Sequence, residues 1–293
     1  RTDRTYYSGD NNSVQLGLSP SEISNPDLKW ETTYQLNGGL DISMFRNRLS
    51  IEADVYYKKT KDMLLHADVP SQIGSYRQWQ NIGQVDNKGF ELTINTVNIQ
   101  KRNFTWSTSL NFNLNRNKVV SLGDVSSIPV KVAGGHITEV GRVMVGHPIG
   151  SGWGYVFDGI YQQSDFDERG NLKEGVPSFA GITVKPGDMK FKDIAGNDNV
   201  IDPNNDTTVI ANSDPKHFGG MTNSFTFKNF DLSFMFQWSY GNDIINIGRY
   251  EGFVGYNNVS TDYWRNRWTE ERPGNRYPSL NGEGKTEMSS YYV

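Results

Sequence analysis

The side chains that most often perform catalysis or bind transition metals are scarce in this sequence. It contains four histidines and no cysteine among 293 residues. The histidines, which we expect to lie in loops without shared metal-ligand spacing, are His66, His136, His147 and His217. The sequence also lacks a nucleophile elbow, a phosphate-binding loop and a dinucleotide-binding fingerprint. We therefore expect no enzymatic activity from this chain.

One stretch rich in oxygen ligands could bind calcium. Its candidate ligands are Asp193, Asn197 and Asp202. Calcium-binding loops of the EF-hand type place oxygen ligands at alternate positions and a glycine at the sixth position. Here Ala195 stands at a ligand position, and Asp198 stands where the glycine is expected. The alternative is a solvated cluster of Asx turns with no bound metal.

A second group of side chains is suited to contacting a sugar or a peptide. Aromatic rings present an apolar face on which a sugar ring or an apolar side chain can stack, and carboxylates and amides supply hydrogen bonds. The candidate substrate-binding residues are Tyr76, Trp79, Trp153 and Trp264 in loops, and Glu52, Asp54, Glu91 and Asn111 on strands. The alternatives are loop packing for the aromatic residues and solvation of a sheet face for the polar ones.

The composition favours a β-rich protein and excludes several other classes. Charged residues make up 21% of the chain and the formal net charge is -4, so no basic stripe is available for nucleic acid. Aromatic residues make up 13%. No apolar run approaches the roughly 18 residues of a membrane-spanning helix. A mean hydropathy of -0.62 is compatible with a β-barrel, whose strands are apolar on one face only.

Long segments in which apolar and polar residues alternate must position the candidate side chains. Leu49, Ile51 and Ala53, for example, alternate with Ser50 and Glu52. Because successive side chains of a strand point to opposite faces, the pattern predicts strands with one apolar and one polar face. The predicted strands lie near 30–44, 48–60, 86–99, 104–118, 219–228 and 230–240. Most contain about ten residues or more, the length needed to cross a bilayer at a tilt.

The connections between these strands alternate in length. Short turns are predicted near 45–47, 100–102 and 228–229, and long loops at 61–85, 119–218 and 241–293. Short turns at one end and long extracellular loops at the other are typical of outer-membrane barrels, as are aromatic residues near both strand ends. The alternative is a soluble or secreted β-domain, with its apolar face turned inward, that binds carbohydrate without transport.

Several longer motifs resemble those of a known family. They are NPDLKWE at 25–31, VGHPIGSGWGYVFDGIYQ at 145–162, PGDMKFKDIAGNDNVID at 186–202 and RWTEERPGNRYPSL at 267–280. In this order they resemble segments of the SusC/RagA family of TonB-dependent outer-membrane transporters. The resemblance extends over nearly the whole chain and rests on the set of motifs together.

The resemblance implies an all-β fold: an arc of a large antiparallel transmembrane β-barrel, which in the intact family has about 22 strands. Residues 1–293 would be part of the barrel domain, with the plug and the N-terminal domains absent, so we expect a fragment. The implied function is import of oligosaccharides or peptides across the Gram-negative outer membrane. The implied partners are a SusD-like surface lipoprotein, the TonB complex acting through the plug, and outer-membrane lipids. The resemblance implies neither a cofactor nor a nucleic-acid partner.

Overall fold

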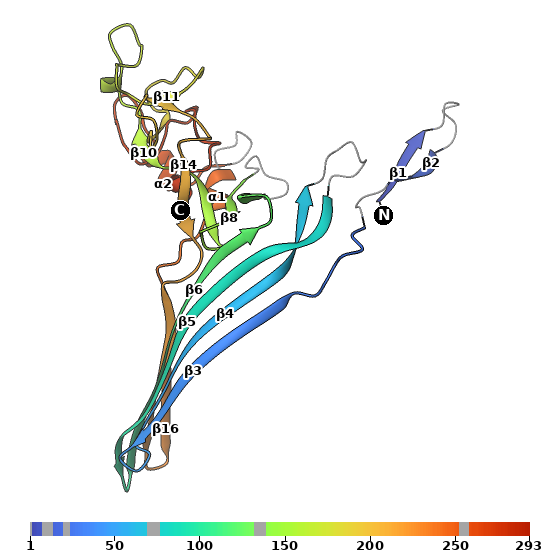
Figure 1. The fold of residues 1–293 in the computed structure, drawn as a ribbon. Helices are drawn as coiled ribbons and strands as arrows, with labels where there is room; N and C mark the ends of the chain where they lie inside the picture. Colours follow the sequence, from blue (N-terminus) through green and yellow to red (C-terminus); the bar gives the residue numbers. More distant parts are fainter. Residues whose placement is uncertain (1, 8–13, 20–23, 69–76, 132–138, 252–257) are drawn as a thin grey trace.

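The largest element of the structure is a six-stranded antiparallel sheet with the order β16-β15-β6-β5-β4-β3. The computed structural model describes residues 2–7, 14–19, 24–68, 77–131, 139–251 and 258–293. The long curved ribbons of this sheet dominate Figure 1. Its strands are β3 (Thr32–Met44), β4 (Leu49–Asp68), β5 (Arg77–Lys101), β6 (Phe104–Leu122), β15 (His217–Phe227) and β16 (Phe230–Tyr240). The expected antiparallel β-architecture is confirmed.

Strands β4, β5 and β6 are longer than the sequence pattern predicted. The expected loop at 61–85 is wrong for most of its length, because β4 continues to Asp68 and β5 begins at Arg77. The register shifts between Thr60 and Met63, and again between Gln84 and Val85. Such bulges break the period of two by which strands are predicted. Two of the histidines expected in loops lie in strands instead, His66 in β4 and His217 in β15, whereas His136 lies outside the described residues.

A small apolar cluster holds the extended ends of these strands together. Val85, Val119 and Leu122 are buried, and Met63 and Leu65 pack against them. These residues lie beyond the alternating segments, where β4, β5 and β6 leave the rest of the sheet. Their burial gives the extension an apolar core of its own, which explains why the strands continue past the predicted loop boundary.

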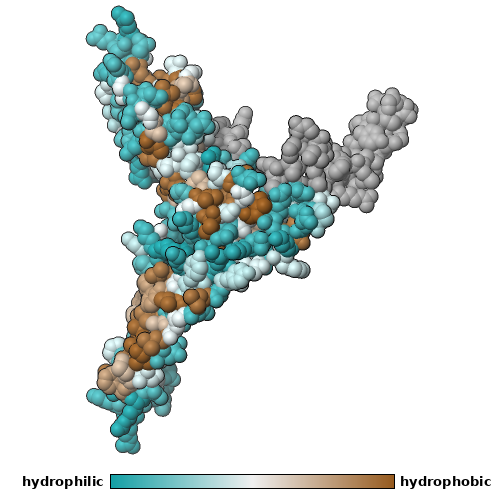
Figure 2. Space-filling view, viewed as in Figure 1, coloured by the Kyte–Doolittle hydropathy of each residue, from teal (hydrophilic) through white to brown (hydrophobic). Residues whose placement is uncertain are grey.

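The sheet has two chemically different faces. One row of paired residues across five strands is apolar throughout: Ile51, Ile94, Leu110, Met221 and Phe236. The neighbouring row on the opposite face consists of Glu52, Thr93, Asn111, Gly220 and Gln237. We call these the apolar face and the polar face. Figure 2 shows apolar residues along the lower half of the sheet, above a hydrophilic tip.

The short connections and the long ones lie at opposite ends of the sheet. Three tight turns, at 45–48, 102–103 and 228–229, lie at the lower end in Figure 1. The first turn places Phe45, Arg46 and Asn47 in the left-handed region, with φ of 55°, 59° and 64°. The described residues of the long segments 123–216 and 241–293 lie at the other end of the sheet. The predicted alternation therefore holds for the long segments after β6 and β16, but not for the expected long loop at 61–85, most of which lies in β4 and β5.

The long segments contain their own secondary structure, and we call their described residues the loop body. A four-stranded sheet has the order β14-β9-β8-β7, and two pairs of short strands accompany it. The strands are β7 (Ser127–Val130), β8 (Gly141–Met144), β9 (Ser151–Tyr155), β10 (Phe157–Ile160), β11 (Ser178–Phe179), β12 (Met189–Phe191), β13 (Val200–Ile201) and β14 (Thr207–Asn212). The helices are η2 (Gln163–Asp165), α1 (Ile247–Glu251), α2 (Thr261–Asn266) and η3 (Ser290–Tyr292). A separate two-stranded antiparallel sheet pairs β1 (Thr2–Tyr7) with β2 (Val14–Ser19).

Both long segments contribute to one apolar core. Tyr155 and Phe191 from the first segment pack in the same cluster as Tyr263, Trp268 and Tyr292 from the second. A backbone hydrogen bond of 2.9 Å from the Tyr155 N–H to the Met288 carbonyl joins the two segments directly. The loop body is therefore a folded unit and not two independent loops. Within the described residues, no helix is long and apolar enough to span a membrane.

Candidate functional site

The four polar candidates predicted from the sequence lie close together on the polar face. Asp54 of β4 stands directly opposite Glu91 of β5. One row nearer the short turns, Glu52 pairs with Thr93, which in turn pairs with Asn111 of β6. Three neighbouring strands thus bring carboxylate and amide groups into two adjacent rows. The arrangement suits hydrogen bonding to hydroxyl, amide or cationic groups on a ligand.

Sequence reasoning missed a fourth carboxylate in this group. Asp41 of β3 pairs with Glu52, and Asp54 pairs with Gly39 one row away. Like charges on directly opposite residues of antiparallel strands are destabilising. The four carboxylates therefore give this part of the polar face a local negative charge, and their mutual repulsion lowers the stability of the sheet. The alternating pattern of residues 32–44 already placed Asp41 on the polar side, which is the signal that could have found it.

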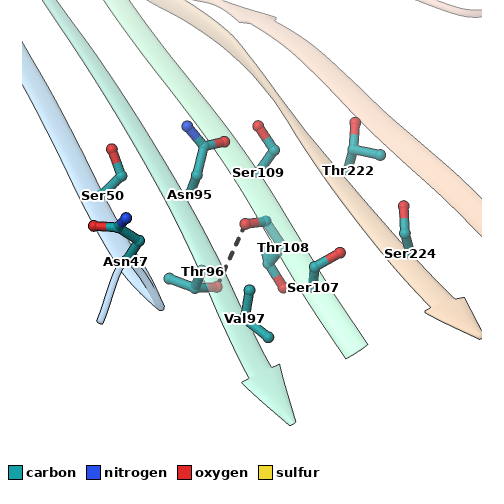
Figure 3. A pocket seen from close by; sticks show the side chains of 10 residues that line it. All are labelled: Asn47, Ser50, Asn95, Thr96, Val97, Ser107, Thr108, Ser109, Thr222 and Ser224. Carbon is teal, nitrogen blue, oxygen red and sulfur yellow. Dashed lines mark hydrogen bonds between the residues drawn. The ribbon is translucent and has the colours of Figure 1, made fainter. Parts of the chain in front are cut away.

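Closer to the short turns, the polar face forms a hollow lined by hydroxyl and amide groups. Ser50, Asn95, Ser109 and Thr222 form one row, with Ser107 and Ser224 beyond them. Figure 3 shows these side chains spread over four strands, with one hydrogen bond of 3.4 Å from the Thr96 hydroxyl to the Thr108 carbonyl. The lining contains no charged side chain. It offers a neutral hydrogen-bonding surface that the sequence analysis did not single out.

The aromatic candidates do not form one cluster. Trp79 of β5 is 39% exposed and lies against its cross-strand partner His66, with ring centroids 3.7 Å apart. Trp264 of α2 is 49% exposed, and the Arg267 guanidinium lies 3.8 Å above its ring. The fourth aromatic candidate, Tyr76, lies outside the described residues.

The third aromatic candidate, Trp153 of β9, lines a cleft in the loop body. The Arg142 guanidinium lies 4.9 Å from the ring centroid and forms an ion pair with Glu139. The indole Nε1 is buried and has no hydrogen-bond partner among the described residues. Glu287 lines the same cleft, and burial raises the pKa of its carboxyl above the ordinary value. The cleft therefore combines an aromatic ring, an unpaired donor and a desolvated carboxyl group.

The predicted calcium ligands lie in a loop with the hydrogen bonds of Asx turns. Asp193 Oδ2 accepts the backbone N–H of Asn199 at 2.9 Å, and Asp202 accepts N–H groups that follow it. Asp206 is fully buried and accepts three backbone N–H groups of the same loop. Burial opposes ionisation of Asp206, but these hydrogen bonds outweigh it and lower the pKa.

Asp193 Oδ1 is buried without a hydrogen-bond partner, and Asn197 is exposed with a φ of 50°. No group of three His, Cys, Asp or Glu side chains in the described part of the chain is arranged to hold a metal ion. Calcium binding by this loop stays a prediction.

Comparison with known proteins decides the family. The family model described as "TonB dependent receptor-like, beta-barrel" matches residues 2–180 of the chain. The chain belongs to this family. As a TonB-dependent receptor barrel it lies in the Gram-negative outer membrane, with its apolar face toward lipid and its polar face toward the lumen. The alternative prediction of a soluble β-domain is therefore wrong.

Relatives of this TonB-dependent receptor are similar along nearly its whole length. It is 37% identical to TonB-dependent receptor P3 of Formosa agariphila over 84% of the chain and 24% of that protein. It is 30% identical to TonB-dependent receptor SusC of Bacteroides thetaiotaomicron over 99% of the chain and 26% of that protein. The chain spans about a quarter of the length of the curated relatives it matches.

Solved structures of a peptide transporter share the fold. The structure of the RagAB peptide importer in the "open-open" state matches with a TM-score of 0.67 and 25% identity, over 96% of the chain and 28% of the matched chain. The structure of the RagAB peptide transporter matches with a TM-score of 0.66 and 23% identity. The resemblance to the SusC/RagA type inferred from the motifs is therefore confirmed.

Proposed function

We propose that the full-length protein is a TonB-dependent importer that carries an oligosaccharide or a peptide across the outer membrane. The observation that supports this most strongly is the similarity to TonB-dependent receptors and to SusC over most of the chain. The two-faced sheet agrees with it, because a wall that is apolar outside and polar inside encloses a hydrated passage. This chain supplies barrel wall and, through the loop body, part of the extracellular surface.

The proposed partners act at the two ends of the barrel. A SusD-like surface lipoprotein caps the extracellular mouth and contacts the loop body. The TonB complex acts from the other side on a plug that lies outside this chain. Exposed apolar side chains on the loop body support a protein partner there: Ile182 is 47% and Leu280 is 45% exposed.

Within this function, two groups of residues are proposed to contact substrate. Glu52, Asp54, Glu91 and Asn111 line the lumen, where their carboxylates and amide face the passage. Trp79, Trp153 and Trp264 project from the extracellular end and offer stacking surfaces, and Tyr76 is proposed with them from its sequence position. Trp153 has the strongest support, because it shares a cleft with Arg142 and Glu287.

Uptake in living cells tests the proposal. The gene is deleted from its host, and growth is followed on a panel of oligosaccharides and peptides, with and without a functional TonB complex. We expect loss of growth on one substrate class, restored by the parent gene only when TonB is present. Growth that is unaffected by the deletion on every substrate, or restored without TonB, would contradict the proposal.

The residue assignments need two test variants and a matched control. Trp153→Ala and Glu52→Gln in the full-length protein are expected to lower the uptake rate several-fold at unchanged surface abundance. Ser43→Ala, on the same face of the neighbouring strand β3 and outside the hydroxyl-lined hollow, serves as the control and is expected to leave uptake unchanged. Equal rates in all three variants would remove these residues from the proposed substrate path.

A further inference from the structure

At the short-turn end of the sheet, the hairpin of β5 and β6 extends further than the neighbouring hairpin of β3 and β4. We call the place where the shorter hairpin ends beside the longer one the step. β5 pairs with β4 as far as Thr96 but continues along β6 to Lys101. Strand pairing with β4 ends after Thr96, with a last backbone hydrogen bond of 2.8 Å from the Val97 N–H to the Arg48 carbonyl, and leaves the carbonyls on this edge of β5 without a strand partner. Arg48 fills this place: its guanidinium donates to the Val97 carbonyl at 2.9 Å and to the Asn98 carbonyl at 3.0 Å. A cation is thereby fixed at the edge of the sheet.

Beside this step, the apolar face carries a hydrogen-bonded polar network. Asn98 donates its amide to the Thr108 hydroxyl at 2.7 Å and accepts from the Thr96 hydroxyl at 2.9 Å. The Thr108 hydroxyl donates to Asn223 Oδ1 at 2.7 Å, and the Trp106 indole N–H donates to the same oxygen at 3.0 Å. The next row away from the turns is apolar on all five strands. Polar groups on a lipid-facing surface fit the level where lipid headgroups begin.

The nearby turns are strongly basic. Residues 45–48, 100–103 and 228–229 contain five cations and no carboxylate: Arg46, Arg48, Lys101, Arg102 and Lys228. All five are exposed. Cations near a membrane surface attract anionic headgroups with about 1 kcal/mol each. A planar guanidinium is also well suited to bidentate contact with a phosphate.

We infer that this step binds the headgroup of an anionic phospholipid. The phosphate lies against Arg48 and the cations of the adjacent turns. The polar groups of Thr96, Asn98 and Thr108 meet the glycerol and ester groups, with the buried Asn223 holding the Thr108 hydroxyl from the next strand. The acyl chains run along the apolar rows. The site needs the outer-membrane location but not the transport activity. The lipid belongs to the periplasmic leaflet of the outer membrane, because the short turns face the periplasm in the proposed orientation.

Native mass spectrometry of the purified full-length protein tests this inference. The protein is mixed with phosphatidylglycerol or phosphatidylcholine in detergent, and bound lipid is counted on the folded protein. We expect phosphatidylglycerol to be retained in preference to phosphatidylcholine. In the triple variant Arg46→Gln, Lys101→Gln, Arg102→Gln, we expect the preference for phosphatidylglycerol to fall about fivefold for each cation removed. The control triple variant Lys131→Gln, Arg169→Gln, Lys173→Gln, in the loop body, is expected to keep the full preference.

A second variant distinguishes a built site from diffuse charge attraction. Asn98→Leu with Thr108→Val removes the side-chain hydrogen bonds that link Thr96, Asn98, Thr108 and Asn223 but leaves every cation in place, and heat-modifiable gel mobility confirms that the variant folds. Loss of phosphatidylglycerol retention in this variant supports the site. Unchanged retention, equal losses in the two triple variants, or no preference in the parent would overturn the inference. Uptake is measured in a separate experiment. If the protein binds the lipid but imports no substrate, the proposed function is contradicted and the lipid site is not.

Discussion

At the scale of single residues, Lys285 introduces a pH dependence into the loop body. Its side chain is only 6% exposed and its ammonium donates to the Leu280 carbonyl. Burial lowers the pKa of Lys285 from 10.5 to about 8, although Asp188 and Glu283 oppose the shift. Below pH 8 the amine is charged in both the folded and the unfolded state, so the cost of burying the charge is fully present.

Between pH 8 and pH 10.5 the folded state loses this proton before the unfolded state does. The stability of the loop body should therefore rise from pH 8 to about pH 9.5, by at most about 2 kcal/mol. At higher pH the buried Tyr155 and Tyr291, whose pKa values burial raises to about 12, oppose the rise because the unfolded state loses their protons first. Limited proteolysis of the full-length protein, with a protease active over the whole range, measures the change. Lys285→Met serves as the control and should abolish the rise. A flat profile in the parent, or the same rise in the variant, would contradict this account of Lys285.

Two strand glycines make a second matched test at this scale. A Cβ on Gly89 would collide with the ring of Tyr56 on the neighbouring strand, whereas one on Gly38 would meet only Val55 Cγ2 at 3.7 Å. Gly89→Ala should therefore destabilise the full-length barrel by about 1–3 kcal/mol through overpacking. Gly38→Ala should have little effect. The temperature at which heat-modifiable gel mobility is lost compares the two variants, and equal temperatures would show that Tyr56 moves aside without cost.

At the scale of elements, the two faces of β16 give a direct test of the membrane placement. Phe236 lies in the row that is apolar across five strands, and its neighbour Gln237 lies in the lumenal row. Phe236→Arg should cost about 2–4 kcal/mol near the middle of the bilayer, because the guanidinium enters lipid. Gln237→Arg should be tolerated. Folding of the full-length protein from urea into lipid bilayers measures both, and similar costs would indicate that lipid does not contact this face.

The strands that could be predicted are those whose alternation is uninterrupted. Residues 230–240 were predicted with their observed bounds, because one face carries a continuous apolar row. The ends of β4 and β5 were not predicted, since Asp62 adopts a φ of 56° and the register shifts on either side of Met63. A bulge exchanges the two faces, so a pattern with a strict period of two ends there even though the strand continues.

The candidate site was also predictable only in part: its residues on the strands could be predicted, and the cleft in the loop body could not. The parity of each strand placed Glu52, Asp54 and Glu91 on one face, and pairing between adjacent strands then brought them together. The cleft around Trp153 was not predictable, because Glu139 and Glu287 are far apart in the sequence. Only the folding of the loop body brings both into the cleft.

At the scale of the whole molecule, the asymmetry between turns and long segments predicts an orientation. Epitope tags inserted near Gly170 in the loop body or at Asn229 in a short turn test it in the full-length protein. The tag near Gly170 should be labelled by antibody on intact cells, because long segments face outward in such barrels. The tag at Asn229 should be labelled only after the outer membrane is permeabilised. The reverse pattern would invert the proposed orientation.

The core shared by the two long segments also constrains how such receptors can diversify. Tyr155 and Phe191 pack against residues that lie more than seventy positions further along the chain, including Tyr263 and Tyr292. Recombination that replaced only one segment with that of another receptor would join halves of two different cores. Variants that survive selection should therefore inherit both segments as a block, and an engineer who transplants specificity between receptors would have to move 123–216 and 241–293 together.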